Sequence, residues 1–195
     1  MLCSKGLSMD LQFERFSIQG PVLCRPKKFA DLRGYFIETY NQRIYAEGGI
    51  SCAFVQDNQS GSTRRGTIRG LHFQIPPEPQ NKLVRVLHGS IFDVAIDLRR
   101  GSATYGRSCT VILTADGGEQ LFVPVGFAHG FCTLEPDTEI AYKVDRFYAP
   151  SCDAGLRWDD PSLGIAWPVN PADVTISDKD AKLPGFKTFV SPFVC

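Results

Sequence analysis

Short segments of aromatic and β-branched residues recur along this 195-residue chain, separated by glycine, proline or aspartate at intervals of about 8 to 15 residues. This spacing is typical of short strands joined by turns. The expected strands cover residues 13–18, 34–40, 54–58, 68–73, 83–87, 91–98, 108–113, 120–123, 129–134 and 139–144. Because helices do not alternate with them, the strands predict an all-β sandwich or barrel of the jelly-roll kind.

Few helices are expected beside these strands. One covers residues 42–47, with Asn41 as its N-cap and Gly48-Gly49 as its stop. The whole chain, 1–195, is expected to form one domain. Residues 1–8 carry no pattern and are expected to be an extension, with Met9 as an alternative start. Residues 155–195 are expected to wrap over the sandwich and to return a late residue such as Asp180 to a site made by earlier strands.

Charge and cysteine content limit the possible partners and compartment. Twenty-one acidic and 21 basic residues give a net charge of zero, so nothing favours nucleic acid or an anionic membrane as partner. No apolar run is long enough to cross a bilayer, and the start lacks the apolar core of a secretory signal. Seven scattered cysteines without metal-like spacing indicate reduced thiols. We therefore expect a cytoplasmic protein.

Two of the three histidines lie in glycine-flanked, strand-like segments: His72 in RGLHFQ and His129 in GFAHGF. A histidine held rigidly inside a barrel is suited to act as a general base. For either histidine alone, a hydrogen-bonded place in the core is an equally good explanation. The motifs GxGxxG, GxxxxGK[ST], GxSxG and HExxH are absent, which disfavours nucleotide redox and phosphoryl transfer.

The glycine and histidine spacings around these segments resemble the cupin signature. Gly66 precedes His72 by six residues, and Gly118, Pro124, Gly126 and His129 follow the spacing of the second cupin motif. The resemblance strengthens the expectation of a cupin-like jelly roll. Metal-binding cupins place a second histidine at the position of Gln74, and an amide is a poor ligand for a transition metal. Glu78 is the available carboxylate for a two-histidine site, but no metal is expected.

Over most of its length the chain resembles the dTDP-4-dehydrorhamnose 3,5-epimerases, also called dTDP-4-keto-6-deoxyglucose 3,5-epimerases. The matching segments, in the family's order, are DLRGYFIETYN, FVQDN, TIRGLHFQ, KLVRVLHGSIFDVAIDLR, SATYG, QLFVPVGFAHGF, EIAYK, RWDDPSLGIAWP and SDKDAKLP. The resemblance implies a homodimer without a cofactor. It implies an isomerase that inverts C3 and C5 of a dTDP-linked 4-keto-6-deoxy sugar through an enolate, giving dTDP-4-dehydro-L-rhamnose for rhamnose biosynthesis.

The resemblance also implies roles for individual residues. His72 corresponds to the base, Asp180 to the carboxylate behind it, Tyr142 to the acid on the opposite face and Lys82 to the cation near the enolate oxygen. Alternation along 139–144 places Tyr142 on the same face as Ile140 and Val144. If His88-Gly89 closes a two-residue hairpin, Val84 opposes Asp93, and Asp93 lies within diagonal reach of Lys82, where it would hold the ammonium charged.

Substrate contacts are implied at further positions. Arg33 corresponds to an arginine that binds diphosphate, and a guanidinium suits that anion. The other residues expected to bind substrate are Phe36, Glu38, Gln56, Asp57, Asn58, Arg69, His129, Tyr148, Asp153 and Lys179. Tyr148 would stack on the base. Asp153 stands where the family usually has glutamate.

Three other interpretations stay open on sequence alone. The chain could invert only C3 or only C5, or act as a keto-isomerase on a related nucleotide sugar, because residue identities do not fix how the sugar ring repositions. It could be a cupin that binds a sugar nucleotide without catalysis, or a metal-dependent cupin enzyme. The joint presence of His72, Lys82, Tyr142 and Asp180 argues against a site without catalysis.

Overall fold

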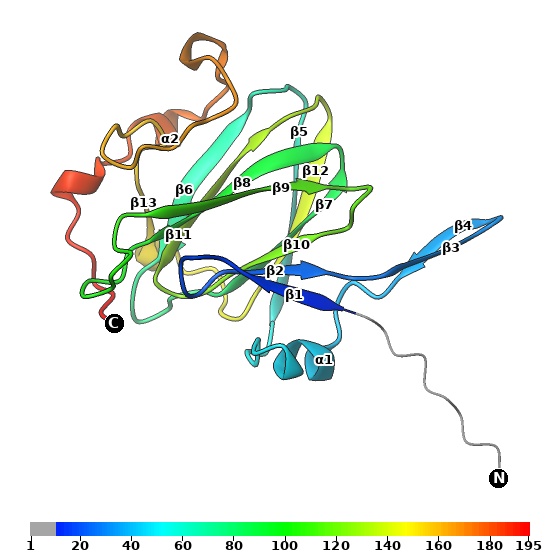
Figure 1. The fold of residues 1–195 in the computed structure, drawn as a ribbon. Helices are drawn as coiled ribbons and strands as arrows, with labels where there is room; N and C mark the ends of the chain where they lie inside the picture. The colour runs from blue at the N-terminus through cyan, green and yellow to red at the C-terminus, as the bar shows by residue number, and fades with distance from the viewer. Residues whose placement is uncertain (1–10) are drawn as a thin grey trace.

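The computed structural model describes residues 11–195, so the expected extension at 1–8 lies outside it. Two antiparallel sheets face each other as a sandwich (Figure 1). The first has six strands in the order β1-β2-β10-β7-β12-β5, and the second has five in the order β13-β6-β11-β8-β9. A separate hairpin, β3–β4, extends away from the body. The fold class predicted from the strand pattern, a cupin-like jelly roll with few short helices, is confirmed.

The strands are short, as the spacing of turn residues predicts. The six-stranded sheet consists of β1 (Gln12–Arg15), β2 (Val22–Arg25), β10 (Gln120–Val123), β7 (Lys82–His88), β12 (Thr138–Val144) and β5 (Gln56–Ser62). The five-stranded sheet consists of β13 (Asp153–Gly155), β6 (Ile68–Gln74), β11 (Phe127–Thr133), β8 (Ser90–Asp97) and β9 (Ser108–Thr114). The hairpin pairs β3 (Lys28–Asp31) with β4 (Gly34–Ile37).

The helices are equally short. They are α1 (Gln42–Glu47), α2 (Asp178–Ala181) and the single 3-10 turns η1 (Pro150–Cys152), η2 (Pro171–Asp173) and η3 (Phe186–Thr188). Helix α1 has the predicted bounds, and the Asn41 side chain accepts from the backbone N–H groups of Arg43 and Ile44. Within residues 11–195, no helix is long and apolar enough to cross a membrane.

Apolar side chains form three buried clusters. One fills the space between the sheets, and it includes Ile91 and Ala95 of β8 and Val84 of β7. A second lies on the other face of the five-stranded sheet, where Leu156, Leu163 and Phe193 of the C-terminal segment pack against it. The third packs α1 against the outer face of the six-stranded sheet. The space between the sheets is therefore apolar except where the site described below opens.

All ten expected strand positions carry strand, with ends that differ by a few residues. Strands β2, β3 and β13 were not predicted. Strand β2 has four residues between Pro21 and Pro26, too few to give a clear alternation, and β13 has only three.

The predicted β7–β8 hairpin is wrong. Strand β7 pairs with β10 and β12, whereas β8 pairs with β11 and β9 in the other sheet. Val84 is aligned with Leu121 and Tyr142, and Asp93 with Phe131 and Val111. The chain crosses from one sheet to the other at Gly89, which has a φ of 75°. A turn between two apolar strands fits a hairpin and a sheet-crossing corner equally well, and the sequence does not distinguish them.

Candidate active site

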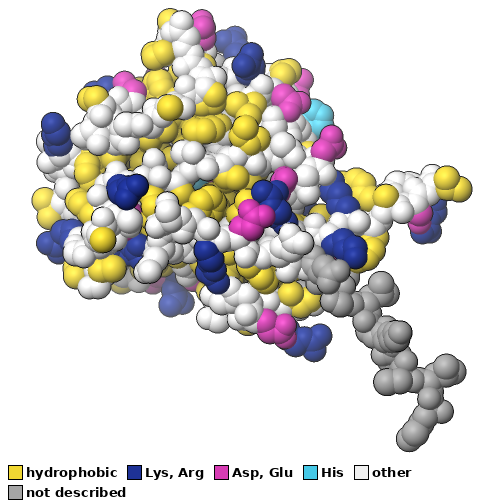
Figure 2. Space-filling view, viewed as in Figure 1, with side chains coloured by type: hydrophobic (Ala, Val, Ile, Leu, Met, Phe, Trp, Pro, Cys, Tyr) yellow, Lys and Arg dark blue, Asp and Glu magenta, His cyan; other side chains and the backbone are white. Residues whose placement is uncertain are grey.

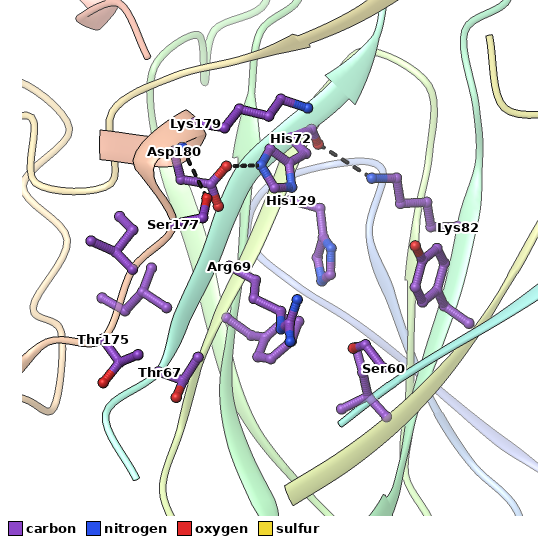
Figure 3. Close-up of a pocket in the computed structure, with 15 residues that line it drawn as sticks. Ser60, Thr67, Arg69, His72, Lys82, His129, Thr175, Ser177, Lys179 and Asp180 are labelled. Atoms are coloured by element: carbon purple, nitrogen blue, oxygen red, sulfur yellow. Dashed lines mark hydrogen bonds and ion pairs between the residues drawn. The ribbon is translucent and has the colours of Figure 1, made fainter. Parts of the chain in front are cut away.

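A cavity of about 540 Å³ opens between the two sheets, beside α2 (Figure 3). The five-stranded sheet contributes Arg69, His72 and His129 to its wall. The six-stranded sheet contributes Lys82 and Tyr142, and the C-terminal segment contributes Lys179 and Asp180. A second cavity of about 300 Å³ shares His72, Lys82, Tyr142 and Lys179 with the first. The four residues expected to be catalytic thus line one site.

His72 on β6 is paired with Asp180 on α2. The His72 Nε2 atom lies 2.7 Å from Asp180 Oδ1 (Figure 3). The Gly70 N–H donates to Asp180 Oδ2 at 3.2 Å. The Ser177 hydroxyl caps α2 by accepting from the Asp180 N–H. Burial raises the pKa of Asp180, but hydrogen bonds from His72, Gly70 and Ser177 outweigh it and lower that pKa below its ordinary value.

This pairing fixes the tautomer of His72. An ionised carboxylate only accepts hydrogen bonds, so Nε2 carries the proton that points to Asp180. Neutral imidazole then has its lone pair on Nδ1. Because Nε2 is occupied, Nδ1 is the ring nitrogen that can take a proton from a bound molecule.

Lys82 reaches the cavity from the opposite sheet, on the inner face of β7. Its ammonium donates to the backbone oxygen of His72 at 3.4 Å. Burial lowers the pKa of Lys82 to about 8, while the charges of Asp153 and Asp93 act in the opposite direction. Near neutral pH the side chain is therefore mostly a cation, as the stabilisation of an anion requires.

Tyr142 lies on β12 beside Lys82 and Val84. It shares the inner face of the strand with Ile140 and Val144, both buried, so the face predicted from alternation is confirmed. Burial raises the pKa of the phenol above its ordinary value of 10. The hydroxyl keeps its proton at neutral pH and can donate it inside the cavity.

Arg69 and His129 complete the wall of the large cavity. The Arg69 guanidinium donates to the Ser62 hydroxyl at 3.2 Å and to the Gly61 carbonyl at 2.9 Å. These bonds hold a cation at the cavity wall. His129 is aligned with His72 across β6 and β11, and its Nε2 lies 2.6 Å from Asp93 Oδ1.

The smaller cavity is rich in hydrogen-bonding groups. Gln56 donates to the Asn58 side chain at 2.8 Å and accepts from the Tyr148 N–H at 3.1 Å. Asp153 forms an ion pair with Lys179 and accepts from the Tyr148 hydroxyl at 3.4 Å. This ion pair raises the pKa of Lys179. These five residues, expected from the resemblance, are brought together.

Four of the expected substrate-binding residues do not reach either cavity. Arg33 lies at the turn of the β3–β4 hairpin, where its side chain is 90% exposed and paired with Asp31. Phe36 is exposed on β4, and Glu38 follows that strand and accepts from Asn41. Asp57 points to the outer face of β5, because side chains alternate along a strand, and it pairs with Lys143. Within one chain these four side chains therefore lie outside both cavities, and their predicted contact with substrate stays a prediction.

Sequence reasoning missed part of the cavity wall. The missed lining residues are Ser60, Thr67, Ile68, Phe131, Ile140, Thr175, Ile176 and Ser177. Alternation from Asn58 along β5 was a usable signal for Ser60. The placement of 175–177 had no such signal, since it depends on the bridge between Thr67 and Thr175, which are distant in sequence.

Gln74, which replaces a metal-binding histidine of cupins, has a structural role. Its amide nitrogen donates to the Glu78 carbonyl at 2.6 Å and to the Phe147 carbonyl at 3.3 Å. Its oxygen accepts from the Ala149 N–H at 2.8 Å. Gln74 thus ties two loops to β6. Among residues 11–195, no three histidine, cysteine or acidic side chains are grouped to hold a metal ion.

A cavity with a histidine–aspartate pair and a tyrosine on facing sheets, and a cation beside them, suits an enzyme that moves protons on a carbon next to a carbonyl group. Residues 15–188 match the family model described as dTDP-4-dehydrorhamnose 3,5-epimerase. The chain belongs to this family. It is 47% identical over 180 residues to the enzyme of that name from Sinorhizobium fredii, covering 92% of each chain. It is 46% identical over 172 residues to that from Methanothermobacter thermautotrophicus, covering 88% of this chain and 92% of the relative.

Solved structures agree with this assignment. A dTDP-4-dehydrorhamnose 3,5-epimerase from Bacillus anthracis, with TDP and PPi bound, is 46% identical with a TM-score of 0.87, over 90% of this chain and 99% of that one. A dTDP-6-deoxy-D-glucose-3,5-epimerase from Legionella pneumophila, in complex with dTDP-4-keto-L-rhamnose, is 39% identical with a TM-score of 0.88, over 92% and 95%. The predicted family and epimerase activity are confirmed.

Proposed function

We propose that this enzyme inverts C3 and C5 of a dTDP-linked 4-keto-6-deoxy sugar without a metal or cofactor, with His72 as the base and Tyr142 as the acid. The observation that carries the proposal is that these two side chains enter one cavity from opposite sheets. Inversion at carbon needs a base on one face of the sugar and an acid on the other. Lys82 supplies positive charge for the oxygen between them.

Each inversion proceeds in two proton transfers. His72 Nδ1 removes the hydrogen from the carbon next to the ketone, and the electron pair of that C–H bond moves to the carbonyl oxygen as an enolate. The Lys82 ammonium stabilises this anion, and Asp180 stabilises the imidazolium that forms. Tyr142 then donates its proton to the opposite face of the carbon. The proton on His72 passes to solvent and the phenol regains one, so the enzyme returns to its starting state.

The two cavities suggest where the parts of the substrate bind. The sugar fits the large cavity, between His72, Lys82 and Tyr142, with His129 and Arg69 as polar contacts. The nucleotide fits the smaller one, where Gln56, Asn58, Asp153 and Lys179 offer donors and acceptors and Tyr148 offers a ring for stacking. TDP bound to the Bacillus anthracis relative supports a thymidine nucleotide.

A homodimer would explain three of the four displaced residues, those on or next to the β3–β4 hairpin. An isolated two-stranded hairpin has little stability of its own, and the β3–β4 hairpin exposes Leu32, Tyr35 and Phe36. Figure 2 shows apolar side chains at its far end, away from the body. We infer that the hairpin packs on a second copy of the chain and brings Arg33, Phe36 and Glu38 near the partner's site.

Mixing two inactive variants tests this arrangement. Hybrid dimers of His72→Ala and Arg33→Ala chains contain one site with both residues intact if the hairpin acts on the partner. Activity should then return on mixing, toward about a quarter of the parent's if the chains assort at random. Light scattering gives the mass of the assembly. A monomer, or no recovery after subunit exchange, would contradict the arrangement.

The reaction itself is tested by proton NMR of dTDP-4-keto-6-deoxyglucose incubated with the enzyme in deuterated water. We expect the C3 and C5 hydrogen signals both to disappear. Exchange at one carbon alone would favour a single-centre epimerase, a possibility supported by a 3'-monoepimerase from Streptomyces bikiniensis that is 30% identical with a TM-score of 0.81. Binding without exchange would leave only the sugar-nucleotide-binding function, and loss of activity with EDTA would indicate a metal.

We also infer a cytoplasmic location. The described cysteines are free thiols, Cys24, Cys52, Cys109, Cys132, Cys152 and Cys195, which fits a reducing compartment. Cell fractionation with an antibody to the chain tests this, and recovery in a secreted fraction would contradict it.

A further inference from the structure

A second histidine–aspartate pair lies beside the first. Strand β11 carries His129 and strand β8 carries Asp93, and the two strands are adjacent in the five-stranded sheet. Asp93 shares the inner face of β8 with Ile91 and Ala95, which belong to the core between the sheets. His129 Nε2 lies 2.6 Å from Asp93 Oδ1, and both side chains are buried. His129 lines the large cavity, whereas Asp93 does not line it and contacts His129 from within the core between the sheets.

Asp93 fixes the tautomer of His129 in the same way that Asp180 fixes the tautomer of His72. Because the Asp93 carboxylate only accepts, His129 Nε2 carries a proton and Nδ1 is the nitrogen left for a ligand. The cavity thus holds two imidazoles, aligned across paired strands, each held through Nε2 by a buried aspartate.

Asp93 has one oxygen without a hydrogen bond. Its Oδ1 accepts from His129 and from the Val94 N–H at 3.1 Å, while Oδ2 is buried and has no partner among residues 11–195. Within residues 11–195, it is the one buried side-chain oxygen or nitrogen atom without a hydrogen-bond partner. A carboxylate that is 0% exposed is costly to keep ionised unless a nearby cation compensates it.

Lys82, on the inner face of the facing sheet, is the candidate for this cation. The acids whose charges favour its protonated form are Asp153 and Asp93. Asp153 is already paired with Lys179, and Asp180 with His72. Among residues 11–195, Asp93 is the acid near Lys82 that has a fully buried oxygen without a hydrogen-bond partner. Within residues 11–195, the Lys82 ammonium in turn has one hydrogen bond, of 3.4 Å, to the His72 carbonyl.

We propose that Asp93 is a positioning residue of this site, which orients His129 through one oxygen and keeps Lys82 protonated through the charge on the other. The two groups then face the enolate oxygen together, His129 as a fixed polar contact and Lys82 as the cation. The inference rests on the proposed function, because it assigns Asp93 a purpose in stabilising the enolate.

The other charged and titratable groups around Lys82 act differently. From β6 the site receives His72 and Arg69, from β12 Tyr142, from β13 Asp153, and from α2 Lys179 and Asp180. Cys109 on β9 is the thiol near Asp93, and burial raises its pKa to about 12, so it stays neutral. Tyr142 titrates above pH 10. Among the neighbouring groups whose pKa is shifted, Lys82 is therefore the one whose pKa moves toward neutrality.

The test compares Asp93→Asn with Asp97→Asn over about pH 6 to 10, measuring hydrogen exchange at C3 and C5. Asp97 is an equally buried aspartate on β8 that lines neither cavity. In Asp93→Asn we expect the alkaline limb of the rate profile to move down by about one pH unit, giving about a tenfold loss above pH 8 that shrinks near pH 6. The Asp97→Asn profile should keep its shape.

A direct titration keeps the inference separate from the reaction. NMR of 13C-labelled lysine, with the Lys82 signal assigned by Lys82→Arg, reports the ammonium whether or not the enzyme turns over. A lower Lys82 pKa in Asp93→Asn, with no change in Asp97→Asn, supports the inference. An unchanged Lys82 pKa, or a rate loss equal at every pH, overturns it. Absence of exchange in the parent would instead refute the proposed function.

Discussion

Asp180→Asn is the sharpest test of His72 as the proposed base. The aspartate accepts two hydrogen bonds at once, from His72 Nε2 at 2.7 Å and from the Gly70 N–H at 3.2 Å. Asparagine has one acceptor oxygen and one NH2 group, so it cannot accept both. If its oxygen stays with Gly70, the NH2 group faces Nε2. His72 must then move its proton to Nδ1, the nitrogen that has to act as the base.

The size of the effect follows from this conflict. The alternative orientation leaves the buried Gly70 N–H without an acceptor, which costs about 1–3 kcal/mol. The active tautomer would then fall to between about a fifth and a hundredth of its population in the parent. The variant also loses the negative charge that stabilises the imidazolium. Together these effects should lower kcat by about 10³- to 10⁴-fold, as for an aspartate behind a catalytic histidine elsewhere.

Rates of C3 and C5 exchange give kcat, and 15N NMR of labelled histidine gives the tautomer of His72. Asp178→Asn, on the exposed side of the same helix, is the matched control and should retain parent activity. A loss of less than tenfold in Asp180→Asn, or a tautomer unchanged from the parent, would refute the argument that Asp180 fixes the base.

Three further predictions concern the acid, the strand contact and acid stability. Tyr142→Phe should lower the rate of inversion by at least about 10²-fold, while His72 still exchanges the substrate hydrogen on its own face. Proton NMR measures the two rates, and an equal loss of inversion and of exchange would contradict this prediction. In Gly70→Ala the new Cβ would lie 2.6 Å from Gly130 Cα, so the free energy of unfolding measured in urea should fall by about 2–4 kcal/mol. Gly34 has a similar φ, but the space around its Cβ position is open, so Gly34→Ala should lower the free energy of unfolding by less. Finally, burial raises the pKa of Asp97, but hydrogen bonds, the largest from Arg99, lower it to about 2. Since the pKa of this carboxyl in the unfolded chain is 3.8, its ionisation should add about 2 kcal/mol to the free energy of unfolding above pH 4. This contribution should disappear as the pH falls to 2, and the stability of Asp97→Asn should lack this pH dependence.

The sequence predicted most strands because their signal is local. Alternation and turn residues define a strand such as β12 without reference to its partners, and so Tyr142 was placed on the correct face. Pairing is not local. The segments on either side of Gly89 read as a hairpin, yet they belong to different sheets, and Asp93 is hydrogen-bonded to His129 on the neighbouring strand β11.

The same distinction explains which site residues were within reach of sequence reasoning. His72 and Asp180 are 108 residues apart and meet only because the C-terminal segment returns to β6, a contact that the resemblance supplied and alternation did not. For Arg33 and Phe36 the sequence indicates the chemistry of the residue but not the site in which it acts. The resemblance assigns them to substrate binding, but they lie on a hairpin that extends away from the body, so in the proposed homodimer they would contact the partner's site. A motif identifies a residue's chemistry, whereas the assembly decides which site that chemistry serves.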